Sequence, residues 1–142
     1  MFSSGSDRYR DAGLLVIRLG FGLGFLWYHG WPKLLGGPQQ WAGTGAAMET
    51  FGITFGAQWW GLAAAVAEAV GGTLLAAGLF FRPTALALLA VMVVATTNHV
   101  VSGQGSPAHA FKNAWLFAGL FLTGPGRYSL DHLLGRRRGW RA

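Results

Sequence analysis

One acidic residue, Glu68, lies near the middle of an otherwise apolar stretch, residues 57–81. This stretch has roughly the 20 apolar residues that a helix needs to cross a bilayer. A carboxylate at the bilayer centre costs about 2.5–3.5 kcal/mol on insertion scales, so it is expected to face protein or water. Gly71 and Gly72 follow within one turn, and small residues allow a neighbouring helix to approach closely. We therefore interpret residues 57–81 as the central helix of a membrane bundle, and Glu68 as the anchor of a polar site within it.

Basic and imidazole side chains on other apolar segments fall near Glu68 in depth. Counting from the expected cytoplasmic ends at a helical rise of about 1.5 Å per residue, Arg18 lies about 10 Å and Glu68 about 20 Å into the bundle. His99 and His29 lie about 25 and 27 Å deep on the same count. The long Arg18 side chain can extend upward, and an Arg–Glu ion pair keeps either charge tolerable within a bilayer. We expect Arg18 to pair with Glu68 in a small polar chamber in the outer half of the bundle.

These residue types suit the binding of a quinone or of a small anion. A quinone requires an apolar slot with hydrogen-bond donors at its carbonyl groups, which His29, Arg18 and His99 can supply. Glu68 can accept or deliver a proton. A small oxyanion such as thiosulfate would instead favour Lys33, Lys112 and Arg18. We assign catalytic roles to Glu68, His29 and Arg18. We assign ligand-binding roles to His99, Asn98, Lys33 and Lys112.

The same residues have a purely structural interpretation. Glu68 and Arg18 can form an ion pair that does no more than fix the register of two helices. Lys33 and Lys112 can be anchors whose ammonium groups extend to the membrane surface. Asn98 lies near a helix end, where polar residues are ordinary. What favours a site is that several ionisable groups fall at one depth in a small bundle.

A metal site receives weaker support from the sequence. His29, His99 and Glu68 have the composition of a two-histidine, one-carboxylate set. No helix carries two such ligands at i,i+3 or i,i+4 spacing, as di-iron bundles do, so we predict no metal ligands. His109 and His132 are interpreted as surface residues.

Composition restricts the class of protein. Of 142 residues, 52% are hydrophobic and only 11% are charged, whereas soluble domains average about 25% charged residues. This composition predicts a single membrane domain, residues 1–142, and makes the net charge of +6 a topology signal. The basic residues are not interleaved with aromatic residues along a polar surface, so nucleic acid is not an expected partner. The absence of Cys excludes thiol–disulfide chemistry and thiolate-ligated clusters carried by this chain.

The apolar pattern predicts an all-α protein, an up-down-up-down bundle of four membrane-spanning helices. The spans are expected at about residues 12–31, 57–81, 84–101 and 109–123. Pro32 is expected to close the first span, and Arg82 and Pro83 to break the chain between the second and third. Residues 33–56 are expected to be a Gly-rich connection containing one short amphipathic piece, at about residues 45–51.

The basic residues predict the orientation in the membrane. Four spans place both termini on one side, and most of the arginines share that side, including those of a basic tail at residues 127–142. The positive-inside rule makes this side, the tail and both termini cytoplasmic. The expected location is the bacterial cytoplasmic (inner) membrane. Leu130, Leu133 and Leu134 can form a short helix on its surface.

Four segments together resemble the DoxX family of small four-helix membrane proteins. They are LLVIRLGFGLGFLWYHGWPKL at residues 14–34, AEAVGGTLLAAGLFFRPTALAL at 67–88, MVVATTNH at 92–99 and GPGRYSLD at 124–131. The positions that carry the resemblance are Arg18, His29, Gly30, Lys33, Glu68, Gly71, Gly72, Arg82, His99 and the terminal motif. Where relatives often have an acidic residue near the start of the last helix, this chain has HAFKN at residues 109–113. The resemblance implies a membrane subunit, in some members that of a thiosulfate:quinone oxidoreductase.

Two classes of function remain open on the sequence. The first is a redox-linked subunit that binds a quinone or small anion as substrate, with no cofactor within the chain and electrons from a partner. The second is a non-catalytic anchor or assembly subunit of an oxidoreductase complex, whose basic tail binds anionic lipid or a cytoplasmic partner. Both imply a lipid bilayer and a protein partner or a homo-oligomer. A transporter is less favoured, because four helices make a narrow bundle.

Overall fold

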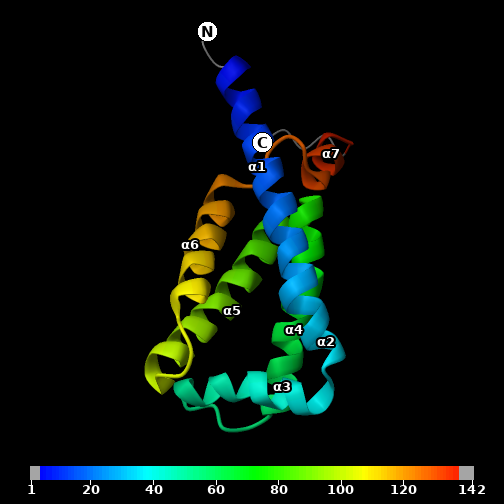
Figure 1. Ribbon diagram of the computed structural model, residues 1–142. Helices are drawn as coiled ribbons and strands as arrows, with labels where there is room; N and C mark the ends of the chain where they lie inside the picture. The colour runs from blue at the N-terminus through cyan, green and yellow to red at the C-terminus, as the bar shows by residue number, and fades with distance from the viewer. Residues whose placement is uncertain (1–3, 138–142) are drawn as a thin grey trace.

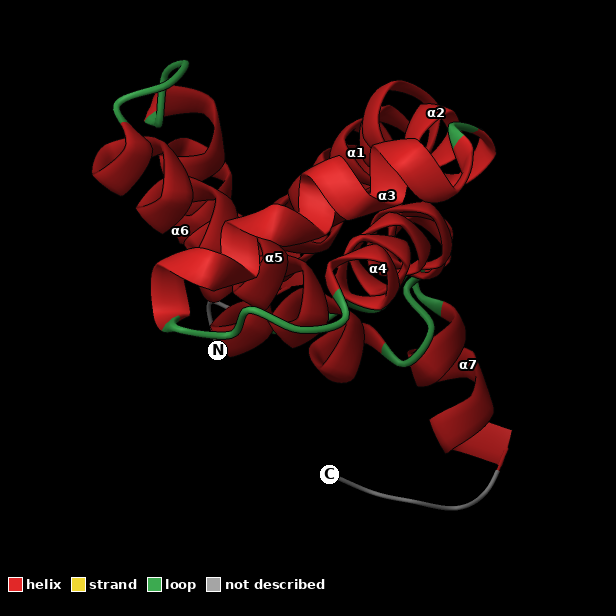
Figure 2. Cartoon of the chain, turned by 90° about the horizontal axis from the view of Figure 1, so that it is seen from below, coloured by secondary structure: helices red, strands yellow, loops and turns green. Residues whose placement is uncertain are grey.

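In the computed structural model, which describes residues 4–137, every regular element of that range is helical. The elements are the α-helices α1 (Ser4–Gly24), α2 (Trp31–Leu35), α3 (Gly37–Gly45), α4 (Ala57–Ala77), α5 (Phe81–Ser102), α6 (Ala108–Thr123) and α7 (Leu130–Arg137), the π-helix η1 (Phe25–Gly30) and the 3-10 helix η2 (Ala46–Phe51). In Figure 1, α3 crosses the end of the molecule opposite the N-terminus, and α7 lies at the N-terminal end. Seen along the helices, α6 lies on one side and α4 with α7 on the other (Figure 2). The prediction of an all-α protein is confirmed.

Three segments are long and apolar enough to cross a membrane: Asp7–Leu35, Ala57–Ala77 and Phe81–Ser102. Their large exposed side chains are mostly apolar, among them Val16, Trp27 and Val70. A water-soluble protein would not cover long helices in this way, whereas lipid is a favourable solvent for such a surface. Helix α6 lies where the fourth span is expected; it has 16 residues and is not one of these three segments.

The first span extends past the expected stop at Pro32 and runs to Leu35. Pro32 lies in the first turn of α2, directly after the π-helical segment η1. A proline normally breaks an α-helix because it lacks an N–H and its ring clashes with the carbonyl four residues earlier. The wider π turn changes which backbone groups are hydrogen-bonded before Pro32, so the helix can continue through the proline. Lys33 is therefore part of helix α2.

The break between α4 and α5 falls before Arg82 and Pro83. Gly78 (φ 66°) and Phe80 (φ 46°) have left-handed backbones, and the carboxylate of Asp131 accepts hydrogen bonds from Phe80 N and Phe81 N, both at 2.9 Å. Helix α5 therefore begins at Phe81. Pro83 is tolerated in the first turn because backbone N–H groups there need no intrahelical partner.

The predicted loop at residues 33–56 is instead largely helical. Helices α3 and η2 fill most of it, and α3 packs across the start of α4. Gly45 and Gly61 lie so close to the facing backbone that a Cβ atom would collide with Ala57 and Trp41, respectively. Small residues on both sides thus allow backbone-to-backbone packing, which hydropathy alone does not reveal.

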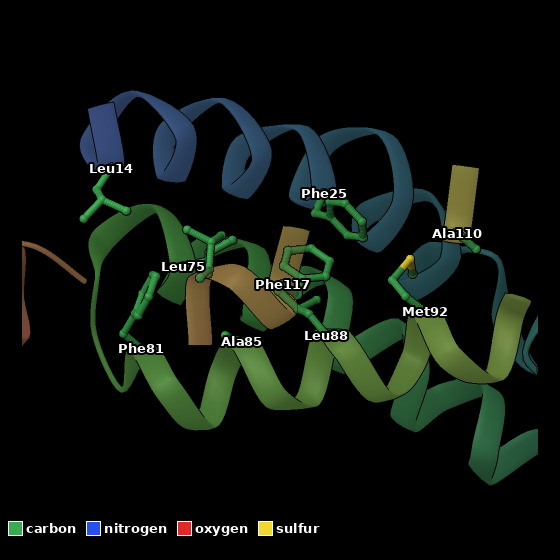
Figure 3. Close-up of a cluster of buried hydrophobic side chains, with 10 residues drawn as sticks. Leu14, Phe25, Leu75, Phe81, Ala85, Leu88, Met92, Ala110 and Phe117 are labelled. Carbon is green, nitrogen blue, oxygen red and sulfur yellow. The ribbon is translucent and has the colours of Figure 1, made fainter. Parts of the chain in front are cut away.

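The apolar core joins all four long segments. Phe25 of η1 meets Phe117 of α6 edge to face, with ring centroids 5.0 Å apart. Leu75 of α4 and Leu88 of α5 are fully buried beside them. Figure 3 shows these side chains converging between the helices.

Glycines hold α1 and η1 directly against α4. A Cβ atom at Gly22 would lie 2.6 Å from the carbonyl oxygen of Gly72, and one at Gly30 would lie 2.7 Å from the carbonyl carbon of Glu68. Gly72 thus permits the close helix approach expected from the sequence. Gly30 sets the distance between η1 and the turn of α4 that carries Glu68.

The change Gly30→Ala is expected to destabilise the protein by about 1–3 kcal/mol, because the added methyl group forces the two backbones apart. Thermal unfolding in detergent measures this loss. The control is Gly20→Ala, since no atom lies within 4 Å of a Cβ there and alanine favours a helix over glycine. Equal stability of the two variants would contradict the tight packing at Gly30.

Candidate functional site

The centre of the site is an ion pair between Glu68 and Lys33. Lys33 Nζ donates to both carboxylate oxygens, at 2.8 Å to Oε1 and 2.7 Å to Oε2. The Glu68 side chain is 0% exposed and that of Lys33 is 28% exposed. An ammonium group has three N–H donors, so one remains free beside the pair. The buried charge is thus neutralised, while one donor stays available to a ligand.

Arg18 does not make the ion pair that the sequence predicted. Its guanidinium instead donates to the carbonyl oxygens of Leu75 (3.3 Å) and Ala76 (3.1 Å) at the end of α4, and to those of Pro125 and Tyr128 (3.0 Å) in the α6–α7 loop. The carbonyl groups at a helix C-terminus lack intrahelical partners, and they attract a buried cation. The side chain therefore points away from Glu68.

A cavity of about 600 Å³ adjoins the ion pair. Segments η1, α2, α3, η2, α4, α5 and α6 all contribute to its walls. Most of the lining is apolar and small, with alanines on α4 and α5. The polar side chains that line it are His29, Lys33, Thr44, Glu68, His99, Ser106 and His109. Cavities of about 300–1,000 Å³ with an apolar wall and a few polar groups are typical of small-molecule sites.

Two histidines face each other on one wall of this cavity. The rings of His29 and His109 are stacked, with centroids 5.1 Å apart. Asn113 Nδ2 lies 3.0 Å from His109 Nε2; the amide donates, so the ring proton of neutral His109 is on Nδ1. The sequence predicts a surface position for His109; the residue is exposed, but it also lines the cavity. No periodic pattern in the sequence links it to His29.

His99 lines the same cavity. Its Nδ1 lies 2.7 Å from the carbonyl oxygen of Gln104, and a carbonyl can only accept, so Nδ1 donates. Nε2 of the neutral ring is then left as an acceptor. Asn98, its neighbour, is turned elsewhere: its Oδ1 accepts from Thr50 Oγ1 at 3.2 Å, and Asn98 does not line the cavity. That hydrogen bond ties η2 to α5.

Lys112 is exposed on α6 and is not part of the cavity wall. Of the three basic residues predicted to attract an anion, only Lys33 is at the cavity, and its charge is matched by Glu68.

Within residues 4–137, no three His, Asp or Glu side chains are grouped so that they could hold a metal ion.

The C-terminal motif closes the opposite end of the bundle. Asp11 Oδ1 accepts from Arg127 N at 3.2 Å, and Ser129 Oγ donates to Gly126 O at 2.7 Å. Asp11 and Ser129 are each 2% exposed. Together with the Arg18 bonds, these contacts hold the α6–α7 loop onto α1 and α4. The motif thus has a structural role, at the end of the molecule remote from Glu68.

The helical architecture and the three apolar spans define an integral membrane protein. The chain matches the family model described as DoxX over residues 13–101. This match covers more than half of the chain, and the chain belongs to the DoxX family. No curated protein and no solved structure matches the chain.

Proposed function

We propose that the cavity beside Glu68 and Lys33 binds the ring of a quinone, and that the protein is a redox-linked membrane subunit. The observation that carries the proposal is the pairing of a fully buried carboxylate with a lysine that keeps one donor free. Lys33 and His109 offer donors to the quinone carbonyl oxygens. Glu68 and His99 offer acceptors to the hydroxyl groups of the quinol. The apolar alanine wall suits the ring itself.

A small anion is a weaker candidate for this cavity. Lys33 is neutralised by Glu68, Arg18 is bound to carbonyl groups at the other end, and Lys112 is outside the cavity. An anion bound beside Glu68 would face a carboxylate without a spare positive charge. A neutral aromatic ring meets no such repulsion, so the charge distribution favours the quinone.

The proposed chemistry is proton-coupled. Reduction of a quinone to a quinol takes up two electrons and two protons. The electrons would come from a partner oxidoreductase in the same membrane. The Glu68 carboxylate would first take up a proton and, like a protonated histidine, would then pass it to a quinone oxygen, as groups positioned within hydrogen-bond reach do in general acid–base catalysis.

We further propose that α1–η1–α2, α4, α5 and α6 form an up-down-up-down bundle with both termini in the cytoplasm of a bacterial cell. Asp11 bonds to Arg127, and Asp131 bonds to Phe80 and Phe81. The start of α1 with Arg8 and Arg10, the α4–α5 junction with Arg82 and the α6–α7 loop with Arg127 thus meet at one end. The positive-inside rule supports a cytoplasmic position for that end, and in this proposal the cavity lies in the outer half of the inner membrane.

The change Glu68→Gln is expected to lower quinone turnover about 10²–10⁴-fold, the range for loss of a general acid or base. The fold should be retained, since glutamine still accepts from Lys33 and the lysine is partly exposed. The measurement is quinone reduction by the protein in membranes with its partner, and unfolding in detergent. Glu49→Gln is the matched control, because Glu49 is exposed on η2.

The same variant tests the alternative of a non-catalytic anchor. If Glu68→Gln unfolds the protein or separates it from its partner while the remaining folded fraction is fully active, the ion pair is only structural. If the unaltered protein, alone and with its partner, neither binds nor reduces a quinone, the proposed function is wrong.

A further inference from the structure

A second hollow lies on the outside of the bundle, between α1 and α6. It is a groove of about 470 Å³, lined by the outward side of α1 and η1 from Val16 to Tyr28 and by His109 and Asn113 of α6. Val16 and Tyr28 are 70% and 77% exposed. At the depth of a membrane span, a mostly apolar groove of this kind opens toward lipid.

The groove and the inner cavity share two residues, His29 and His109. Their stacked rings form the partition between the two hollows. Helix α1 packs mainly on α4, and α6 packs mainly on α5. The partition therefore consists of side chains rather than of backbone, and a side chain can change its rotamer without movement of a helix. Rotamer changes of accessible side chains take only picoseconds to nanoseconds.

We propose that the site is loaded sideways from the bilayer by an amphiphile whose polar ring occupies the cavity and whose apolar chain lies in the groove. The ligand passes between His29 and His109, which then separate the ring from the lipid. This inference rests on the proposed quinone function and specifies its substrate: a quinone with a long chain. From Val16 to Tyr28 the groove extends over 12 helical steps, or about 18 Å.

Shape, rather than hydrophobicity, would select the chain. Moving an alkyl chain from lipid into an apolar groove exchanges one apolar environment for another, so packing determines the gain. Gly20 and Gly24 lie one turn apart in the groove wall and leave it open. No atom lies within 4 Å of a Cβ at either position, so a larger side chain there would fill the groove without striking the backbone.

The test uses the full-length protein in lipid nanodiscs with two probes, a long-chain benzoquinone and the same ring without the chain. The variants are Gly20→Leu and Gly24→Leu. The control is Gly119→Leu, since Gly119 is exposed on α6, has no atom within 4 Å of a Cβ and lines neither hollow. We expect both groove variants to bind the long-chain probe about tenfold more weakly, a change of about 1.4 kcal/mol. The ring-only probe and the control should be unaffected.

Three other results would overturn this inference in distinguishable ways. Unchanged binding of both probes by the groove variants would show that the chain lies elsewhere, while the quinone function would stand. Failure of the unaltered protein to bind either probe would remove the quinone function as well. Loss of a dimer in Gly24→Leu with unchanged binding would assign the groove to a helix of a second copy.

Discussion

Replacing Lys33 with Met is expected to destabilise the protein by about 3–5 kcal/mol, the cost of leaving one partner of a buried ion pair unpaired. The Glu68 carboxylate is 0% exposed and loses both of its lysine hydrogen bonds in this variant. Methionine fills much of the volume of the lysine stem, so the loss reports the charge rather than a cavity. Thermal and denaturant unfolding in detergent measure it. Lys112→Met is the control, because Lys112 is exposed on α6.

The second change Glu68→Gln should recover much of this stability in the double variant. Removing both charges removes the buried unpaired carboxylate, and the loss in the double variant is then smaller than the sum of the single losses. Additive losses would show that Lys33 and Glu68 are not coupled. Recovery of stability without recovery of quinone turnover would separate the structural part of the pair from its chemical part.

The burial of Glu68 inside the bundle was predictable, because a carboxylate within an apolar membrane helix has few alternatives. Glu68 is buried and faces the cavity, as a charge at bilayer depth must. The partner of Glu68 was not predictable from depth alone. Counting depth along the sequence treats the first span as a regular α-helix that ends at Pro32. In the structure the π-helical segment η1 precedes Pro32, the helix continues beyond it, and Lys33 points toward Glu68.

His109 shows a different limit of sequence reasoning. Its distance from His29 along the chain carries no periodicity, and only the packing of α6 on α5 brings the two rings together. The position of α3 across the end of the bundle was not predictable from the sequence for a related reason. Gly45 and Gly61 appear in the sequence as loop and spacer residues, but they act as contact points between backbones.

The change Arg18→Ala is expected to destabilise the protein by about 3–5 kcal/mol, because several buried carbonyl groups lose a charged donor worth about 1.5–3 kcal/mol in each bond, and such losses are not additive. Arg18 is 1% exposed. It joins the end of α4 to the α6–α7 loop. Arg18→Lys should recover only part of the loss, since an ammonium cannot reproduce the planar fork of donors.

The measurements for Arg18 distinguish a structural role from a catalytic one. Hydrogen exchange should rise at residues 124–131 in Arg18→Ala, and quinone binding should persist below the lowered unfolding temperature, because the bonds of Arg18 lie at the end of α4 beyond Glu68. Arg82→Ala is the control, since Arg82 is an exposed arginine at the same end. If Arg18→Ala keeps its stability but loses quinone binding, the guanidinium acts at the cavity, as the sequence alone suggested. The four carbonyl contacts of Arg18 predict the opposite result, in which the loop detaches while the cavity beside Glu68 still binds the ring.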